Sequence, residues 1–212
     1  MQIKVIPVTA FQQNCSILIC DETNKAAVID PGGDLDVILA RLKETGATPE
    51  KILITHGHID HAGATAELAE ILRVPVEGPH KDEKGLIDSI AQQGSMFGLQ
   101  GKVFSPDRWL KDNDTVTVGN QTLEVIHCPG HTLGHIVFYN PKQRFAVVGD
   151  VIFKGSIGRT DLPGGNHQSL VDSIRNKLFP LGDDIQFLPG HGPLSTFGAE
   201  RQTNPYVGDR AV

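Results

Sequence analysis

Apolar runs of strand length alternate with amphipathic stretches of helix length along this chain. The first half opens with short apolar runs at 3–8, 15–20 and 26–29. Polar residues typical of turns separate them, which predicts a meander of strands. Residues 35–45 place apolar side chains at helical spacing and end before Gly46, which predicts a helix with a glycine C-cap. The remaining predictions for this half are a strand at 51–55, a helix near 61–72 and a polar helical stretch near 80–93.

Strand patterns return in the second half. Apolar runs predict strands at 115–118, 122–127, 135–139 and 144–148, then a helix near 167–178 and a strand at 185–188. Linkers rich in Gly, Ser or Pro do not interrupt the pattern. We therefore expect one α+β domain over residues 1–212.

The two halves resemble each other weakly. AAVIDPG (26–32) is similar to FAVVGD (145–150), and KILITHGH (51–58) is similar to IQFLPGHG (185–192). In each half, one apolar strand ends in a polar residue and a later one ends in histidine. Two halves with matching plans would bring two sets of ligands to one seam. The alternative is that short apolar strands simply look alike.

Composition narrows the class of protein. Lys plus Arg number 19 against 25 Asp plus Glu, a net charge of −6 that disfavours nucleic acid as a partner. The sequence has no apolar run long enough to span a membrane and no signal-peptide pattern, so we expect no membrane association. The three cysteines have no C-x-x-C spacing, which favours a reducing cytoplasm. We also expect a monomer.

The strongest chemical feature follows the predicted strand at 51–55. His56, His58, Asp60 and His61 fall within six residues. In an extended segment His56 and His58 point the same way, because side chains repeat every two residues. A helix beginning near Asp60 would turn Asp60 and His61 to another side. Imidazole and carboxylate suit Zn, Fe or Mn rather than Ca.

Three further candidate ligands also follow predicted strands. His131 lies in Pro-Gly-His-Thr, Asp150 in Gly-Asp, and His191 in Pro-Gly-His-Gly. The ends of strands are where ligand sites of α/β folds collect. Each is weak alone, but together with the first loop they indicate a metal centre.

These motifs, H-x-H-x-D-H, G-H-T, G-D and G-H in this order, resemble the metallo-β-lactamase superfamily, and within it a short form of glyoxalase II. The resemblance implies an αββα sandwich with the metal centre at one edge of the two sheets. It assigns His56, His58 and His131 to one metal and Asp60, His61 and His191 to a second. Asp150 and a hydroxide would bridge the two.

Such a centre suits hydrolysis of a small anionic thioester, S-D-lactoylglutathione or a related acylglutathione. Two divalent ions, Zn²⁺ first with Fe or Mn as alternatives, lower the pKa of a bound water toward about 7. Asp60 could orient the resulting hydroxide and take its proton. A thiolate leaving group, with an ordinary pKa near 8.5, departs without a strong acid.

Candidate supporting residues surround these ligands. Asp30 is expected to accept a hydrogen bond from His56 or His58, and His135 to act as a structural or supporting residue. Lys154 and Arg159 are the candidate substrate-binding residues. Arg159 and Asp161 occupy the places where glyoxalase II has a lysine and a tyrosine for glutathione, and Asp161 would repel an anionic tail. Cys128 is expected in the core, and His80, His127 and His167 in structural or solvated positions.

The resemblance leaves other functions open. Only residues 192–212 follow His191, without room for the helical domain of long glyoxalase II, so we expect weaker glutathione binding. The main alternative is a persulfide dioxygenase, which holds one iron with two histidines and an aspartate. A lactonase or β-lactamase, a nuclease of the same superfamily and a metal-stabilised scaffold are further alternatives.

Overall fold

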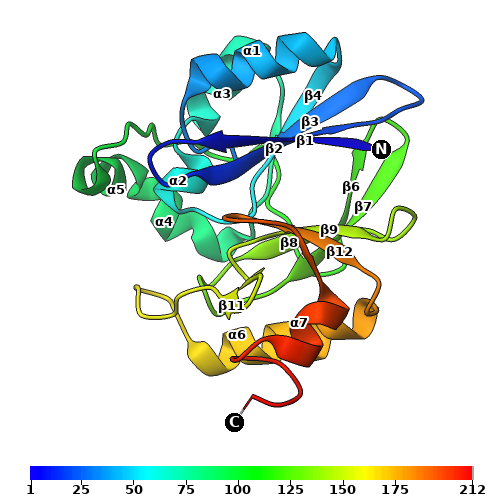
Figure 1. Cartoon of the computed structure of the whole chain (residues 1–212). Coiled ribbons are helices and arrows are strands. Elements are labelled where there is room, and N and C mark those ends of the chain that lie inside the picture. The colour runs from blue at the N-terminus through cyan, green and yellow to red at the C-terminus, as the bar shows by residue number, and fades with distance from the viewer. Residues whose placement is uncertain (212) are drawn as a thin grey trace.

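Two β-sheets pack face to face, with helices on their outer faces (Figure 1). The structure is a computed structural model and describes residues 1–211. Helices α1 (Leu35–Thr45) and α3 (Thr65–Leu72) cover the first sheet, and α6 (His167–Ser173) and α7 (Phe197–Thr203) cover the second. This is the αββα sandwich that the family resemblance implied.

The first sheet has the strand order β1-β2-β3-β4-β5. Its first three strands are antiparallel and its last three are parallel, because α1 and α3 connect strands that run in one direction. The strands are β1 (Gln2–Val8), β2 (Gln13–Ile19), β3 (Lys25–Ile29), β4 (Thr48–Leu53) and β5 (Val76–Glu77).

The second sheet has the order β13-β12-β9-β8-β7-β6. All of its pairs are antiparallel except β9 with β12. Its strands are β6 (Thr115–Val118), β7 (Gln121–His127), β8 (Ile136–Asn140), β9 (Phe145–Gly149), β12 (Gln186–Pro189) and β13 (Ser195–Thr196). A hairpin of β10 (Ile152–Phe153) and β11 (Ser156–Ile157) follows β9.

Apolar side chains form one core between the sheets and one under each helical layer. Strand β2 shows how: Ile17 and Ile19 belong to the core under α1, whereas Leu18 belongs to the core between the sheets. Alternate residues of a strand face opposite sides, and here both sides are buried. This explains why the sequence shows continuous apolar runs rather than an alternating pattern.

The predicted helix near 61–72 is two helices, α2 (Ile59–Ala62) and α3. The break has a packing cause. A Cβ atom on Gly63 would lie 2.6 Å from the carbonyl oxygen of Gly32, and the Ala64 amide donates to the Pro31 carbonyl oxygen at 2.9 Å. The chain turns here because the loop after β3 packs against it.

The polar stretch near 80–93 is also divided, and it extends further than predicted. It forms a 3₁₀ turn (Lys81–Glu83), α4 (Lys84–Asp88) and α5 (Ile90–Phe97). The predicted helix at 167–178 is α6 followed by a π-helical segment (Ile174–Leu178) and a 3₁₀ turn (Phe179–Leu181). Gly46 ends α1 with φ of 64°, as predicted.

The weak internal similarity has a structural counterpart. Strands β3 and β4 are parallel neighbours in the first sheet, and β9 and β12 are parallel neighbours in the second. These are the strands that carry the two pairs of similar segments. The ligand-bearing loops of both halves therefore leave equivalent strand ends.

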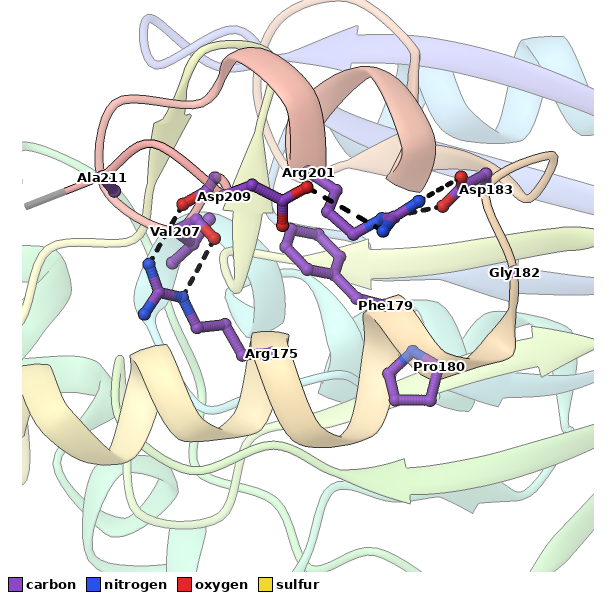
Figure 2. A pocket seen from close by; sticks show the side chains of 10 residues that line it. Arg175, Phe179, Pro180, Gly182, Asp183, Arg201, Val207, Asp209 and Ala211 are labelled. Atoms are coloured by element: carbon purple, nitrogen blue, oxygen red, sulfur yellow. Dashed lines mark hydrogen bonds and ion pairs between the residues drawn. The ribbon is translucent and has the colours of Figure 1, made fainter.

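The C-terminal segment closes over the second helical layer (Figure 2). Arg175 donates to the carbonyl oxygens of Val207 and Gly208, and Arg201 pairs with Asp183 and Asp209. A cavity of about 780 Å³ lies among these residues, but its arginines are already paired, which indicates a structural role. Among residues 1–211, we find no helix of the length and apolar character that a membrane crossing requires.

Candidate metal centre

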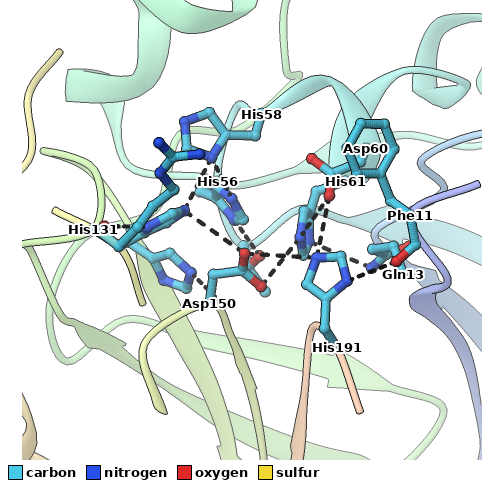
Figure 3. A network of polar contacts seen from close by, with 12 residues as sticks. Phe11, Gln13, His56, His58, Asp60, His61, His131, Asp150 and His191 are labelled. Atoms are coloured by element: carbon cyan, nitrogen blue, oxygen red, sulfur yellow. Dashed lines mark hydrogen bonds and ion pairs between the residues drawn. The ribbon is translucent and has the colours of Figure 1, made fainter. Parts of the chain in front are cut away.

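Loops from both sheets meet at one edge of the sandwich (Figure 3). They follow the carboxyl ends of β4, β7, β9 and β12, as predicted. The loop after β4 leads into α2, whose N-cap is His58. All seven residues predicted as ligands are brought together there: His56, His58, Asp60, His61, His131, Asp150 and His191.

The first ligand group consists of three imidazoles. Nε2 of His56 lies 3.1 Å from Nδ1 of His58, and Nε2 of His131 lies 3.0 Å from the same His58 nitrogen. His56 and His131 are buried, and His58 is partly buried. Three nitrogens that converge on one point are a typical donor set for a transition metal.

The second ligand group lies beside the first. Nε2 of His191 is 3.1 Å from Oδ2 of Asp60, and Nε2 of His61 is 3.8 Å from the same oxygen. Asp60 and His61 come from α2, and the His61 ring packs beside that of His56, with ring centroids 4.1 Å apart. One short loop thus contributes to both groups.

Asp150 lies between the two groups, as Figure 3 shows. Its Oδ1 is 3.2 Å from Nε2 of His61, and its Oδ2 is 3.7 Å from Nε2 of both His131 and His191. Its carboxylate can therefore contact an ion in either group.

The unsatisfied atoms support a metal rather than a hydrogen-bonded network. Nε2 of His61 and Oδ1 of Asp150 are buried and face each other at 3.2 Å, but within residues 1–211 neither has a partner in hydrogen-bond geometry. Leaving such atoms without partners costs about 1–3 kcal/mol each, so a ligand is expected. Five imidazoles and two carboxylates fit a pair of divalent transition-metal ions.

Electrostatics keep most donors in the form that binds metal. Burial lowers the pKa of His56, and it lowers that of His58 to about 3, so both imidazoles are neutral. Burial opposes ionisation of Asp150, but His61 and His131 outweigh it and hold the pKa of Asp150 below its usual range. Burial likewise lowers the pKa of His61, yet Asp150 and Asp60 shift it upward overall.

Asp30 supports the ligands in a way that differs from the prediction. Nδ1 of His61 lies 3.0 Å from Oδ2 of Asp30, so the direct partner is His61 and not His56 or His58. Asp30 also accepts from the Thr55 amide at 2.8 Å and the Thr55 hydroxyl at 2.6 Å. Nδ1 of His56 lies 3.0 Å from that hydroxyl, so Asp30 reaches His56 only through Thr55.

The reason for the difference is the backbone at the end of β3. Asp30 adopts a left-handed conformation, with φ of 51°, and sends its side chain between the loop after β4 and α2. Nothing in a single strand-ending Asp-Pro-Gly indicates that turn.

His135 contacts candidate ligands without belonging to either ligand group, as expected for a supporting residue. It is buried, and its Nε2 accepts a hydrogen bond from the Asp150 amide at 3.0 Å. Its ring stacks on His56, with ring centroids 4.6 Å apart. His135 thus contacts one residue of the first group and the residue between the groups.

Glu83 and Gln93 were not predicted. The buried Glu83 carboxylate accepts from the amides of Gly57 at 2.7 Å and Gly134 at 2.6 Å, and so joins two ligand loops. Gln93 accepts from the Ile59 amide at 3.0 Å. Glu83 lies in the charged run Lys-Asp-Glu-Lys, which reads as a solvated surface, so the sequence offers no signal for its burial.

The candidate substrate-binding residues lie outside the ligand groups. Both arms of the exposed Arg159 guanidinium bond to Asp161, at 2.8 and 2.7 Å, and this pairing lowers the pKa of Asp161 to about 2. The Arg159 carbonyl oxygen accepts from Nδ1 of His131 at 2.8 Å. Lys154 is exposed at the turn between β10 and β11.

The remaining predictions concern core and surface residues. Cys128 is buried in the core under α6, and burial raises the pKa of its thiol to about 12, so it is a core residue as predicted. His80 and His127 stack on each other with ring centroids 4.4 Å apart, and His167 is exposed at the start of α6.

Comparisons with known proteins agree with this geometry. A family model described as the metallo-beta-lactamase superfamily matches residues 8–191. The hydroxyacylglutathione hydrolase GloC of Haemophilus influenzae is 43% identical over the full length of both chains.

Two solved structures are also similar. BLEG-1, described as a B3 metallo-beta-lactamase, has a TM-score of 0.89 at 36% identity, covering 97% of this chain and 99% of its own. TTHA1623, solved in a di-iron-bound form, has a TM-score of 0.87 at 35% identity, covering 96% of this chain and 99% of its own. The chain described here, with its two ligand groups at the edge of an αββα sandwich, belongs to the metallo-β-lactamase superfamily of hydrolases.

Proposed function

We propose that this protein hydrolyses the thioester of S-D-lactoylglutathione, or a related acylglutathione, to glutathione and the hydroxy acid. The observation that best supports this proposal is the position of Asp150 between the two groups of candidate ligands, which fits a dinuclear hydrolytic centre. The full-length similarity to a protein named hydroxyacylglutathione hydrolase supports the choice of substrate.

The donor set assigns the metals to residues. His56, His58 and His131 would hold one ion, and Asp60, His61 and His191 the other, with Asp150 shared. Divalent ions there, which we propose to be Zn²⁺, supply Lewis acidity and a water of lowered pKa. The di-iron form of TTHA1623 supports iron as the alternative.

Asp60 is the proposed catalytic residue. Its side chain is 16% exposed and that of His191 is 29% exposed, so this side of the centre is open to substrate and water. His61 and His191 lower the pKa of Asp60 although burial opposes them. As a carboxylate, Asp60 can orient the attacking water and accept its proton.

The thiolate leaving group does not need a strong general acid from the protein. Hydrolysis forms a C–O bond from water and breaks the C–S bond, and the proton released by water ends on the thiolate. A thiolate leaves readily near neutral pH, since its ordinary pKa is about 8.5. The nearby carboxylates Asp30 and Glu83 are occupied by hydrogen bonds, which suits a reaction that needs no further acid.

We propose Lys154 and Arg159 as contacts for the glutathione carboxylates. Arg159 would exchange Asp161 for a substrate carboxylate, which a guanidinium binds in the same bidentate geometry. The reaction would take place in the cytoplasm, on a monomer without nucleic-acid or membrane partners, and would serve methylglyoxal detoxification. Three buried free cysteines support a reducing compartment.

The test pairs metal analysis with a thiol-release assay on S-D-lactoylglutathione under nitrogen. We expect about two ions per chain, release of free thiol without oxygen, and loss of both in Asp150→Asn, with the exposed His167→Asn as control. One iron per chain, with sulfite formed from glutathione persulfide and O₂ in a separate aerated assay, would support the persulfide dioxygenase instead. Cleavage of lactones or β-lactams without thioester cleavage would also reject the proposal.

A further inference from the structure

An apolar pocket opens directly beside the first ligand group. It has a volume of about 500 Å³, and His58 forms part of its wall. The other walls come from α4, α5, the loop after His131 and the segment 162–164. Six apolar side chains line it: Leu86, Met96, Phe97, Leu133, Leu162 and Pro163.

This pocket is fixed to the ligand loops. Gln93 accepts from the Ile59 amide at 3.0 Å and donates to the Leu86 carbonyl oxygen at 2.8 Å, so it joins α5 and α4 to the start of α2. Glu83, also in the wall, joins Gly57 to Gly134. Whatever fills the pocket is therefore held at a set position relative to the ligand groups.

Several of these apolar side chains lie open to solvent. Met96 is 72% exposed, Leu133 56% and Phe97 51%. Apolar side chains that gather around a pocket next to a reactive centre are typical of a ligand site. Burial against an apolar ligand would remove this surface from water.

The charges of the pocket wall indicate which part of a thioester substrate the pocket can bind. The pocket wall includes the carboxylate of Asp82, and among residues 1–211 it has no lysine or arginine; the Glu83 carboxylate, also in the wall, is buried against the amides of Gly57 and Gly134. The glutathione portion carries two carboxylates and one ammonium, a net charge of −1, and its carboxylates would find no cation there. The uncharged acyl portion meets no such obstacle.

We propose that this pocket binds the acyl group of the substrate, and that the enzyme prefers uncharged, apolar acyl groups longer than lactoyl. The inference rests on the proposed thioester hydrolysis and specifies its substrate class. Ligand pockets for small molecules span roughly 300–1,000 Å³, and a lactoyl group would fill little of this one. Each additional buried methylene is expected to raise kcat/KM about threefold to fourfold.

The test is a chain-length series of S-acylglutathiones from lactoyl through butanoyl and hexanoyl to octanoyl. We expect kcat/KM to be at least tenfold higher for hexanoyl than for lactoyl. Leu133→Asp and Met96→Asp should each remove most of this preference, because they place a carboxylate in the pocket. Ile71→Asp is the matched control, since Ile71 is 53% exposed on α3 and lies outside the pocket.

A second measurement does not depend on turnover. Calorimetric binding of S-hexylglutathione, a thioether that cannot be hydrolysed, is expected to be at least tenfold tighter than that of S-methylglutathione. The two aspartate variants should lose this difference and Ile71→Asp should keep it.

The outcomes separate the two proposals. Hydrolysis of S-D-lactoylglutathione with a flat chain-length series overturns the acyl pocket and leaves the proposed function in place. No hydrolysis of any acylglutathione rejects the proposed function, and equal binding of the two thioethers then rejects the pocket as well. A dimer that the aspartate variants dissociate, with unchanged selectivity, would assign the apolar side chains to a contact between two copies.

Discussion

Asp30 is the residue on which both ligand groups depend. It bonds to His61 directly and reaches His56 through the Thr55 hydroxyl. Both contacts hold the Nδ1 proton in place and leave Nε2 of each imidazole free to bind metal. A single carboxylate therefore fixes the orientation of a ligand in each group.

Replacing Asp30 with asparagine should weaken metal binding. The amide can still accept from the Thr55 amide, but its NH₂ would face the Nδ1 proton of His61. We expect metal affinity to fall about 10–100-fold, measured by competition with a chelator. Asp36→Asn, an exposed carboxylate in the first turn of α1, is the control. Equal affinities in the two variants would contradict the role given to Asp30.

Gly190 is needed because the ligands approach its backbone closely. A Cβ atom there would lie 2.1 Å from Oδ1 of Asp150 and 2.5 Å from Cε1 of His61. Gly190→Ala should displace both ligands, lower the metal content below two ions per chain and reduce kcat about 100-fold or more. Elemental analysis and initial rates check this. Gly46→Ala, at the C-terminus of α1 with open space around it, should keep its metal.

The seven candidate ligands could be located from the sequence because each lies near the end of a strand or at the start of a helix, and the structure brings them together. The histidine that Asp30 contacts was predicted wrongly, because the contact depends on the left-handed backbone conformation of Asp30 itself. Glu83 was missed for a different reason. Its burial depends on two amides, from Gly57 and Gly134, that are distant in sequence.

At the scale of elements, helix α6 supports one of the ligand loops. Gly130, next to His131, packs against Leu170 of α6, and the Asn166 amide donates to the Gly130 carbonyl oxygen at 2.8 Å. The Asn166 side chain caps the helix by accepting from the Ser169 amide at 2.9 Å. The start of α6 and the His131 loop are thus stabilised together.

Loss of this cap should destabilise the protein modestly. Asn166→Ala is expected to lower the free energy of unfolding by about 1 kcal/mol, because an amide at the helix start loses its acceptor. Urea unfolding followed by circular dichroism measures the change. Gln168→Ala, two positions further along and exposed, should change stability by less than half as much. A larger effect at Gln168 would argue against the capping role.

Long elements were easier to predict than short ones. The apolar runs of β2, β8 and β9 and the helical spacing of α1 are strong patterns because whole faces are buried. Strands β5, β10, β11 and β13 have two residues each, too few to show a period. The break between α2 and α3 arises from contact with the loop after β3, which local spacing does not reveal.

At the scale of the whole molecule, the metal centre connects the two sheets. The loop after β4 belongs to the first sheet, and the loops bearing His131, Asp150 and His191 belong to the second. Bound ions would therefore hold the halves of the sandwich together as well as provide chemistry. Metal binding and folding stability should be linked.

Removal of metal should lower the melting temperature. A ligand present at about 1,000 times its Kd stabilises by about 4 kcal/mol, which corresponds to roughly 8–16 °C for a chain of this size. Calorimetry with and without a chelator measures the shift, and added Zn²⁺ should restore it. Asp150→Asn should respond less. Identical melting temperatures with and without chelator would mean that the ions do not stabilise the sandwich.

The two ligand groups differ in their access to solvent. In the first group His56 and His131 are buried and His58 is partly buried, whereas in the second group His61 is buried but the side chains of His191 and Asp60 are 29% and 16% exposed. An ion held by the second group is therefore expected to exchange with the surroundings faster than one held by the first group. The metal in the second group would then reflect the metals available at the time, while an ion in the first group would be replaced more slowly.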